Sequence, residues 1–219
     1  MTNKVYIDGF IGEVYDYWAD ELKNTSNSNL VKTLAEMNGD LEIHINSKGG
    51  DAFEGMALLG TLKNYDKGEK TLVVDGFCAS AATLPLFAVD HVKAHETSMF
   101  CFHKSATFAM GHASDLRKSA DDLERIDDVV MDLYLSKFKG SKEELESLLD
   151  EDRLMSAKEA HELGFIDEII TNEEEPEKEE PQPKATMSFL DGFKLAQDHV
   201  DKEHDKLENS FLAKFKKFE

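Results

Sequence analysis

Apolar and polar positions along the first 170 residues form short segments separated by glycine or polar turns. Period-two alternation or a short apolar run predicts a strand, whereas apolar residues at helical spacing predict a helix. The expected strands cover residues 5–7, 41–46, 71–74, 90–94, 98–103 and 165–170. The expected helices are two short ones within 15–37, those at 52–65, 84–89 and 115–139, and two capped ones that begin at Ser141 and Ser156. This interleaving indicates an α/β domain.

One strand-turn-helix junction carries candidate chemistry. The strand at 71–74 runs into the small-residue turn 76–83, which contains Ser80 and leads to the next predicted helix. Backbone N–H groups at a helix start have no partner within the helix, so a serine hydroxyl beside them suits acyl transfer. The alternative interpretation is a tight turn packed with alanines.

A second junction has the same form. Residues 46–51 follow the strand at 41–46 and open the helix at 52–65, and the paired Gly49 and Gly50 let backbone N–H groups approach a ligand. A plain helix-start turn is the alternative. His103 ends an apolar strand, which fits either a hydrogen-bonded core residue or a catalytic base. His44 lies on the polar phase of its strand and is expected on the surface.

Composition excludes several classes of function. The net charge of −20 over 219 residues argues against nucleic acid and anionic membranes as partners. The amino terminus contains no apolar signal core, and no apolar run has the length of a membrane span, so a cytoplasmic location is expected. Cys78 and Cys101 lie in apolar stretches and are expected to be free buried thiols. No Cys or His pair stands at metal-ligand spacing, so neither a metal nor another cofactor is expected.

The chain divides into three predicted parts. Residues 172–184 contain six glutamates and three of the four prolines, a composition typical of an extended linker. Residues 188–218 regain apolar positions at helical spacing, five of them phenylalanine. The expected organisation is a catalytic domain at 1–171, an acidic linker at 172–186 and an amphipathic helical tail at 187–219.

Four separated segments, at residues 45–50, 76–82, 99–103 and 152–160, together resemble the Clp-type serine peptidases. Among these the chain is most similar to phage proteases of head maturation. The resemblance covers about residues 4–170. It implies a ClpP-like, crotonase-like fold of repeated strand-strand-helix units.

The resemblance also implies a set of site residues. Ser80 would be the nucleophile, His103 the base and Asp152 the residue that orients the imidazole, while the N–H groups of Gly50 and Ala81 would form the oxyanion hole. Asp150 is a second candidate for the orienting carboxylate. Lys48 stands where the family usually has proline, which predicts a less rigid turn.

The implied function is a serine endopeptidase that acts on polypeptides and assembles into a ring of six or seven subunits, with the helix at 115–139 as the handle for stacking two rings. The tail is expected to pair with copies of itself or to bind capsid or scaffold proteins, and the alternative is that it docks on its own peptidase domain. A Clp-type ATPase partner is not favoured, because the first predicted strand begins almost at Met1 and leaves little room for axial loops. The alternatives are a housekeeping Clp subunit that works with an ATPase, a crotonase-type acyl-CoA enzyme, and a shell or scaffold protein without activity.

Overall fold

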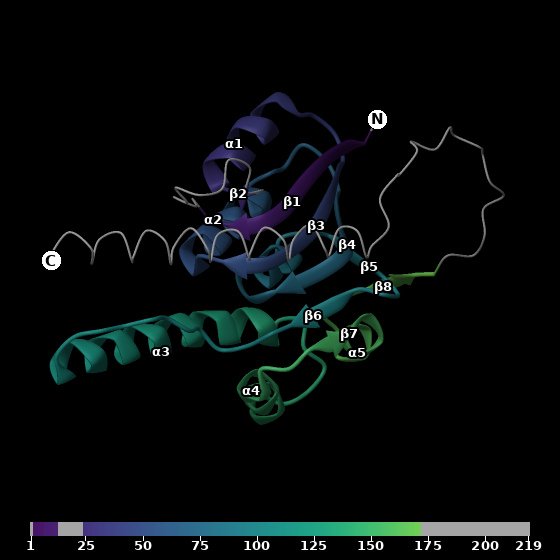
Figure 1. The fold of residues 1–219 in the computed structure, drawn as a ribbon. Coiled ribbons are helices and arrows are strands. Elements are labelled where there is room, and N and C mark those ends of the chain that lie inside the picture. Colours follow the sequence, from purple (N-terminus) through teal and green to yellow (C-terminus); the bar gives the residue numbers. More distant parts are fainter. Residues whose placement is uncertain (1, 13–23, 172–219) are drawn as a thin grey trace, which may run out of the picture. The chain divides into compact units, whose positions relative to one another are not determined.

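The computed structural model describes residues 2–12 and 24–171, which form an α/β fold around one sheet (Figure 1). The strands are β1 (Asn3–Ile11), β2 (Asn24–Thr25), β3 (Leu41–Gly50), β4 (Lys70–Ala79), β5 (His91–His95), β6 (Met99–Cys101), β7 (Met155–Ser156) and β8 (Glu168–Ile170). The helices are α1 (Asn27–Glu36), α2 (Ala52–Lys63), the 3₁₀ helix η1 (Ser80–Phe87), α3 (Ala113–Leu135), α4 (Lys142–Glu151) and α5 (Ala157–Glu162). The prediction of an α/β domain is confirmed.

Parallel pairing dominates the sheet, whose main order is β2-β1-β3-β4-β5-β8. The long β4 pairs with β5 along its first half and with β6 along residues 77–79, and β6 in turn pairs antiparallel with β7. Because β4 changes neighbour before Ser80, the strand end that carries this serine lies next to the strand that leads to His103. The topology therefore brings the two predicted catalytic residues to one edge of the sheet.

The core lies between one face of the sheet and the helices packed on it. Ile7, Ile43, Ile45 and Val74 are fully buried, and η1 packs between β3 and α2. The alternation of buried and exposed positions along β3 explains its period-two pattern. Figure 1 shows α1 and α2 on one side of the strands, with α3, α4 and α5 gathered near β6 and β7.

The predicted elements are present in the described ranges, but two segments have a different type of secondary structure from the one predicted. The glycine turn at 46–51 is largely part of β3, since residues as far as Gly50 pair with β1. The helix expected at 84–89 is instead a 3₁₀ helix that begins at Ser80 itself. Pro85 lies inside η1 and has no N–H to donate, which disfavours a regular α-helix there. The caps predicted at Ser141 and Ser156 are both present as capping boxes.

The long helix α3 is less buried than its apolar face predicts. Met131 and Tyr134, in its last two turns, are its buried residues, whereas Leu116 is 44% exposed. Figure 1 shows the first half of α3 projecting beyond the sheet, with the segment that follows β6 running alongside it. An apolar stripe therefore extends past the domain's own core.

His44 is partly exposed, as the sequence predicts, but it also belongs to a cluster of charged side chains. Its Nδ1 lies 2.9 Å from a carboxylate oxygen of Asp75 and its Nε2 lies 2.9 Å from one of Glu42, while its ring stacks on Tyr6. Carboxylates only accept, so the ring donates to both of them when it is protonated on both nitrogens. Partial burial lowers the pKa of His44, but the hydrogen bonds to Asp75 and Glu42 outweigh it and leave the pKa raised. The parallel pairing of β3 and β4 thus places these charged side chains together on one face of the sheet.

Three predictions fall outside the described residues: the first of the two short helices within 15–37, the acidic linker at 172–186 and the helical tail at 187–219. Within residues 2–12 and 24–171, no helix combines the length and apolarity that crossing a bilayer requires.

Candidate active site

Ser80 occupies a strained backbone position where β4 becomes η1. Its φ of 55° lies in the left-handed region, which costs a non-glycine residue about 1–2 kcal/mol. The backbone of Ala79, the preceding residue, is extended, so the chain changes from strand to 3₁₀ helix within one residue. Such strain persists only where surrounding contacts hold it, and it is common at sites of function.

Two buried hydroxyl groups hold that conformation. The Thr83 hydroxyl donates to the Ser80 carbonyl at 2.7 Å, and its oxygen lies 2.6 Å from the Tyr134 hydroxyl. Because the single Thr83 proton is used on the carbonyl, Tyr134 is the donor of the second bond. This chain ties the serine turn to α3. Thr83 and Tyr134 are 51 positions apart, so nothing in the local sequence indicates this contact.

The glycine turn at the end of β3 packs directly against the serine turn. A Cβ placed on Gly49 would lie 2.7 Å from the Ala79 carbonyl oxygen and 2.7 Å from the Ser80 Cβ, so only glycine permits this approach. Gly49 also has a φ of 93°, where glycine is strongly favoured. The two junctions that the sequence indicated separately are therefore one structure.

Side chains of Asn46 and Ser47 hold the glycine turn in place. The Ser47 hydroxyl donates to the Gly9 carbonyl at 2.6 Å and accepts from the Gly49 N–H at 3.0 Å. The Asn46 side-chain oxygen accepts from the Phe77 N–H at 3.1 Å, which bridges β3 to β4. These bonds give the turn a restraint that does not depend on proline at position 48.

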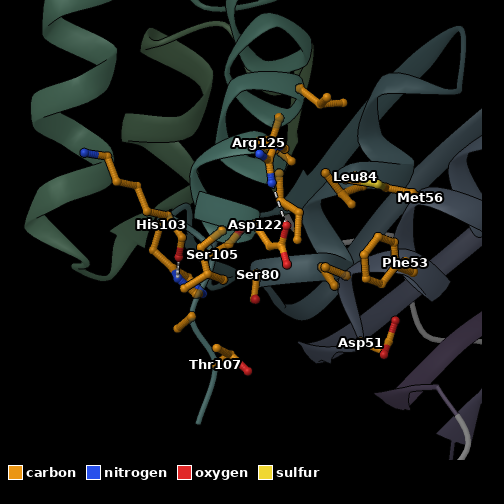
Figure 2. A pocket seen from close by; sticks show the side chains of 18 of the residues that line it. Asp51, Phe53, Met56, Ser80, Leu84, His103, Ser105, Thr107, Asp122 and Arg125 are labelled. Atoms are coloured by element: carbon orange, nitrogen blue, oxygen red, sulfur yellow. Dashed lines mark hydrogen bonds and ion pairs between the residues drawn. The ribbon is translucent and has the colours of Figure 1, made fainter. Parts of the chain in front are cut away.

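Ser80, His103, Gly50 and Ala81 all line one cleft of about 870 Å³. Figure 2 shows Ser80 in the middle of this cleft, with His103 and Ser105 on one side and the apolar side chains of Leu84, Met56 and Phe53 on the other. The structure therefore brings together four of the five predicted site residues. An apolar wall beside a hydroxyl and an imidazole suits an uncharged side chain of a substrate.

The His103 ring is held by the peptide group between Lys104 and Ser105. Its Nδ1 lies 2.6 Å from the Lys104 carbonyl oxygen, which can only accept, so Nδ1 carries a proton. In the neutral ring the free lone pair is then on Nε2. This tautomer is the one that a base needs in order to take a proton from a serine.

Asp152, the fifth predicted residue, is not hydrogen-bonded to His103. It lies at the carboxyl end of α4 with a φ of 45°, and its carboxylate accepts a bond from the Cys101 thiol at 3.5 Å. The alternative candidate, Asp150, forms an ion pair with Lys104 at 2.5 Å. No hydrogen bond among the described residues joins either carboxylate to the imidazole.

The two cysteines differ in exposure. Cys78 is fully buried, and burial raises the pKa of its thiol, so it is not a thiolate near neutral pH. Cys101 is only half-buried, which corrects the expectation of two buried thiols. Burial and the neighbouring Asp152 raise the pKa of Cys101 as well. Among residues 2–12 and 24–171, no group of three His, Cys, Asp or Glu side chains is placed to hold a metal ion.

Comparison with known proteins gives consistent results. Residues 13–173 match the family model described as Clp protease. The chain is 30% identical over 166 residues to the ATP-dependent Clp protease proteolytic subunit 2 of Thermobifida fusca (strain YX), covering 74% of this chain and 80% of that protein. Its fold is similar to that of a point mutant of ClpP1 from Listeria monocytogenes, with a TM-score of 0.64 and 22% identity over 78% of this chain and 92% of that one.

Proposed function

This chain belongs to the Clp protease family and is a serine-type peptidase, and we propose that Ser80 is its nucleophile and His103 its base. The observation that supports this assignment is the shared cleft: a serine at a strained strand-helix junction lines it together with a histidine and two turns of backbone N–H groups. Family membership favours this function over the acyl-CoA enzyme and the inactive scaffold.

The proposed reaction is a two-step hydrolysis. The Ser80 Oγ attacks the carbonyl carbon of the scissile peptide bond while His103 Nε2 takes its proton, and the N–H groups of Gly50 and Ala81 donate to the developing oxyanion. His103 then gives the proton to the departing amine, which leaves an acyl-serine. Water, deprotonated by the same imidazole, hydrolyses the ester and regenerates the serine. Asp152 is proposed as the residue that stabilises the imidazolium through its negative charge.

The test is covalent labelling. A serine-directed phosphonate should add one equivalent per chain at Ser80, because the reagent needs the same activated hydroxyl and oxyanion donors as a peptide. Peptide mapping by mass spectrometry locates the adduct, and heat-unfolded protein is the control for nonspecific reaction. An adduct confined to another residue, or hydrolysis of peptides that continues after complete labelling, would remove Ser80 from the role.

We further propose that the protein acts as a ring of six or seven subunits, with two rings stacked through α3, in the maturation of a phage head. The apolar stripe of α3 that projects beyond the core supports a contact between subunits. The competing arrangement is a housekeeping Clp subunit with an ATPase partner, since the Thermobifida relative is named ATP-dependent.

Removal of the tail separates these arrangements. We expect that a chain ending at Thr171 still hydrolyses short peptides, because the residues of the cleft all precede that point. Its binding to capsid or scaffold protein, measured by co-sedimentation with the full chain as the control, should be lost. Unchanged binding would argue against the delivery role, and degradation of unfolded protein only with a Clp-type ATPase and ATP would favour the housekeeping arrangement.

A further inference from the structure

The two residues after His103 are each held by a carboxylate from a different helix. The Ser105 N–H donates to Asp127 of α3 at 2.6 Å, and the Lys104 ammonium pairs with Asp150 of α4 at 2.5 Å. The charged face of α3 includes Asp127, whose side chain is partly buried against the segment that carries the predicted base.

The two contacts differ in strength. The side chains of Lys104 and Asp150 are 43% and 60% exposed, and ion pairs exposed to water contribute little to stability. The bond from Ser105 to Asp127 is partly buried and has a charged acceptor, and such bonds are stronger than exposed ion pairs. Asp127 is therefore the principal anchor of the segment.

Asp127 and His103 bind opposite ends of the same peptide group. The Lys104 carbonyl accepts from His103 Nδ1, and the Ser105 N–H of that peptide unit donates to Asp127. A peptide group is planar and rigid, so fixing its N–H direction fixes its carbonyl direction as well. A carboxylate on the N–H also polarises the carbonyl and makes it a stronger acceptor.

We propose that Asp127 is a positioning residue that orients His103 through the 104–105 peptide group and keeps the proton on Nδ1. This inference depends on the proposed role of His103 as the base. It gives the histidine a carboxylate partner in a chain where neither Asp150 nor Asp152 is hydrogen-bonded to the ring. Asp127 acts only through the backbone, since its bond is to the Ser105 N–H and not to the imidazole.

The decisive comparison is Asp127→Ala against Asp127→Asn, with Asp128→Ala as the matched control on the exposed side of α3. Asp127→Ala should lower kcat by about 10- to 100-fold with KM within about twofold, because small misplacement of a catalytic group costs up to about 10² in rate. Asparagine keeps an oxygen that accepts from the Ser105 N–H, so Asp127→Asn should recover most of the rate. Asp128→Ala should match the wild type.

A second readout reports the histidine directly. In ¹⁵N-histidine spectra, with His103 assigned by its loss in His103→Gln, the neutral ring should be protonated on Nδ1 in the wild type and in Asp127→Asn. It should shift towards the other tautomer in Asp127→Ala. Equal kcat and equal tautomer in Asp127→Ala and Asp128→Ala would overturn the proposal.

Two further controls keep the result interpretable. If Asp127→Ala does not fold, Asp127→Glu keeps the charge but moves the oxygen, and a kcat equal to that of Asp127→Asn would count against the proposal. Ser80→Ala, measured in parallel, distinguishes the two levels of inference. Activity in Ser80→Ala defeats the assigned nucleophile, whereas an inactive Ser80→Ala beside a fully active Asp127→Ala defeats only the positioning role.

Discussion

Replacement of Ser80 by alanine should lower peptide hydrolysis by about 10⁴-fold or more while the protein stays folded and assembled. Loss of the hydroxyl removes the atom that we propose forms the acyl-enzyme, and removing one member of a cooperating catalytic group has effects of this size. The fold should tolerate the change because Ser80 contributes its backbone carbonyl, not its hydroxyl, to the hydrogen-bonded chain through Thr83 and Tyr134. Initial rates with a fluorogenic peptide and thermal unfolding measure the two effects.

Cys78→Ala is the matched control for a thiol nucleophile two residues away. The Cys78 thiol is buried and donates to the Ala82 carbonyl, so its loss should leave kcat within a few fold of the wild type. Near-normal hydrolysis by Ser80→Ala would mean that the nucleophile lies elsewhere. A loss of activity in Cys78→Ala alone, with unchanged unfolding, would direct attention to the thiol.

Replacement of Gly50 by alanine should damage both stability and catalysis. A Cβ at this position would lie 2.1 Å from the Ile11 carbonyl oxygen, and the φ of 155° is rarely adopted by other residues. The clash is with backbone that pairs β1 to β3, so relief requires movement of the strand end. We expect a loss of about 1–3 kcal/mol in unfolding free energy. Displacement of an oxyanion donor should lower kcat by about 10²- to 10³-fold.

Gly60→Ala is the control for this substitution. A Cβ on Gly60 would meet nothing within 4 Å, and the residue lies inside α2. Alanine there should raise the unfolding free energy by about 0.5–1 kcal/mol and leave kcat unchanged. Urea unfolding and initial rates on both variants check the pair. A Gly50→Ala protein with wild-type stability would show that the end of β3 does not require glycine at this position. A wild-type rate would show that the Gly50 N–H is not an oxyanion donor.

Local pattern was sufficient to identify most of the elements. Alternation in β3, apolar runs in β4 and β6, and capping boxes at Ser141 and Ser156 depend on neighbours within a few positions, which a sequence displays directly. The 3₁₀ form of η1 was not predicted, because the apolar run at 84–89 fits either helix type. Burial along α3 was overestimated, since apolar spacing does not tell how far a helix extends past its core.

The α/β class, the residue types of the predicted site and the position of Ser80 before His103 could be predicted from the sequence, because short contiguous motifs carry this information. Three contacts are visible only in the folded structure: the Gly49 turn touches the Ser80 turn, Thr83 and Tyr134 hold the serine backbone, and His103 bonds to a peptide group anchored by Asp127. Each of these contacts joins elements remote in sequence, and the bond to Ser105 uses a backbone N–H that every residue except proline possesses. No residue pattern marks such partners, so their pairing depends on the path of the chain in space.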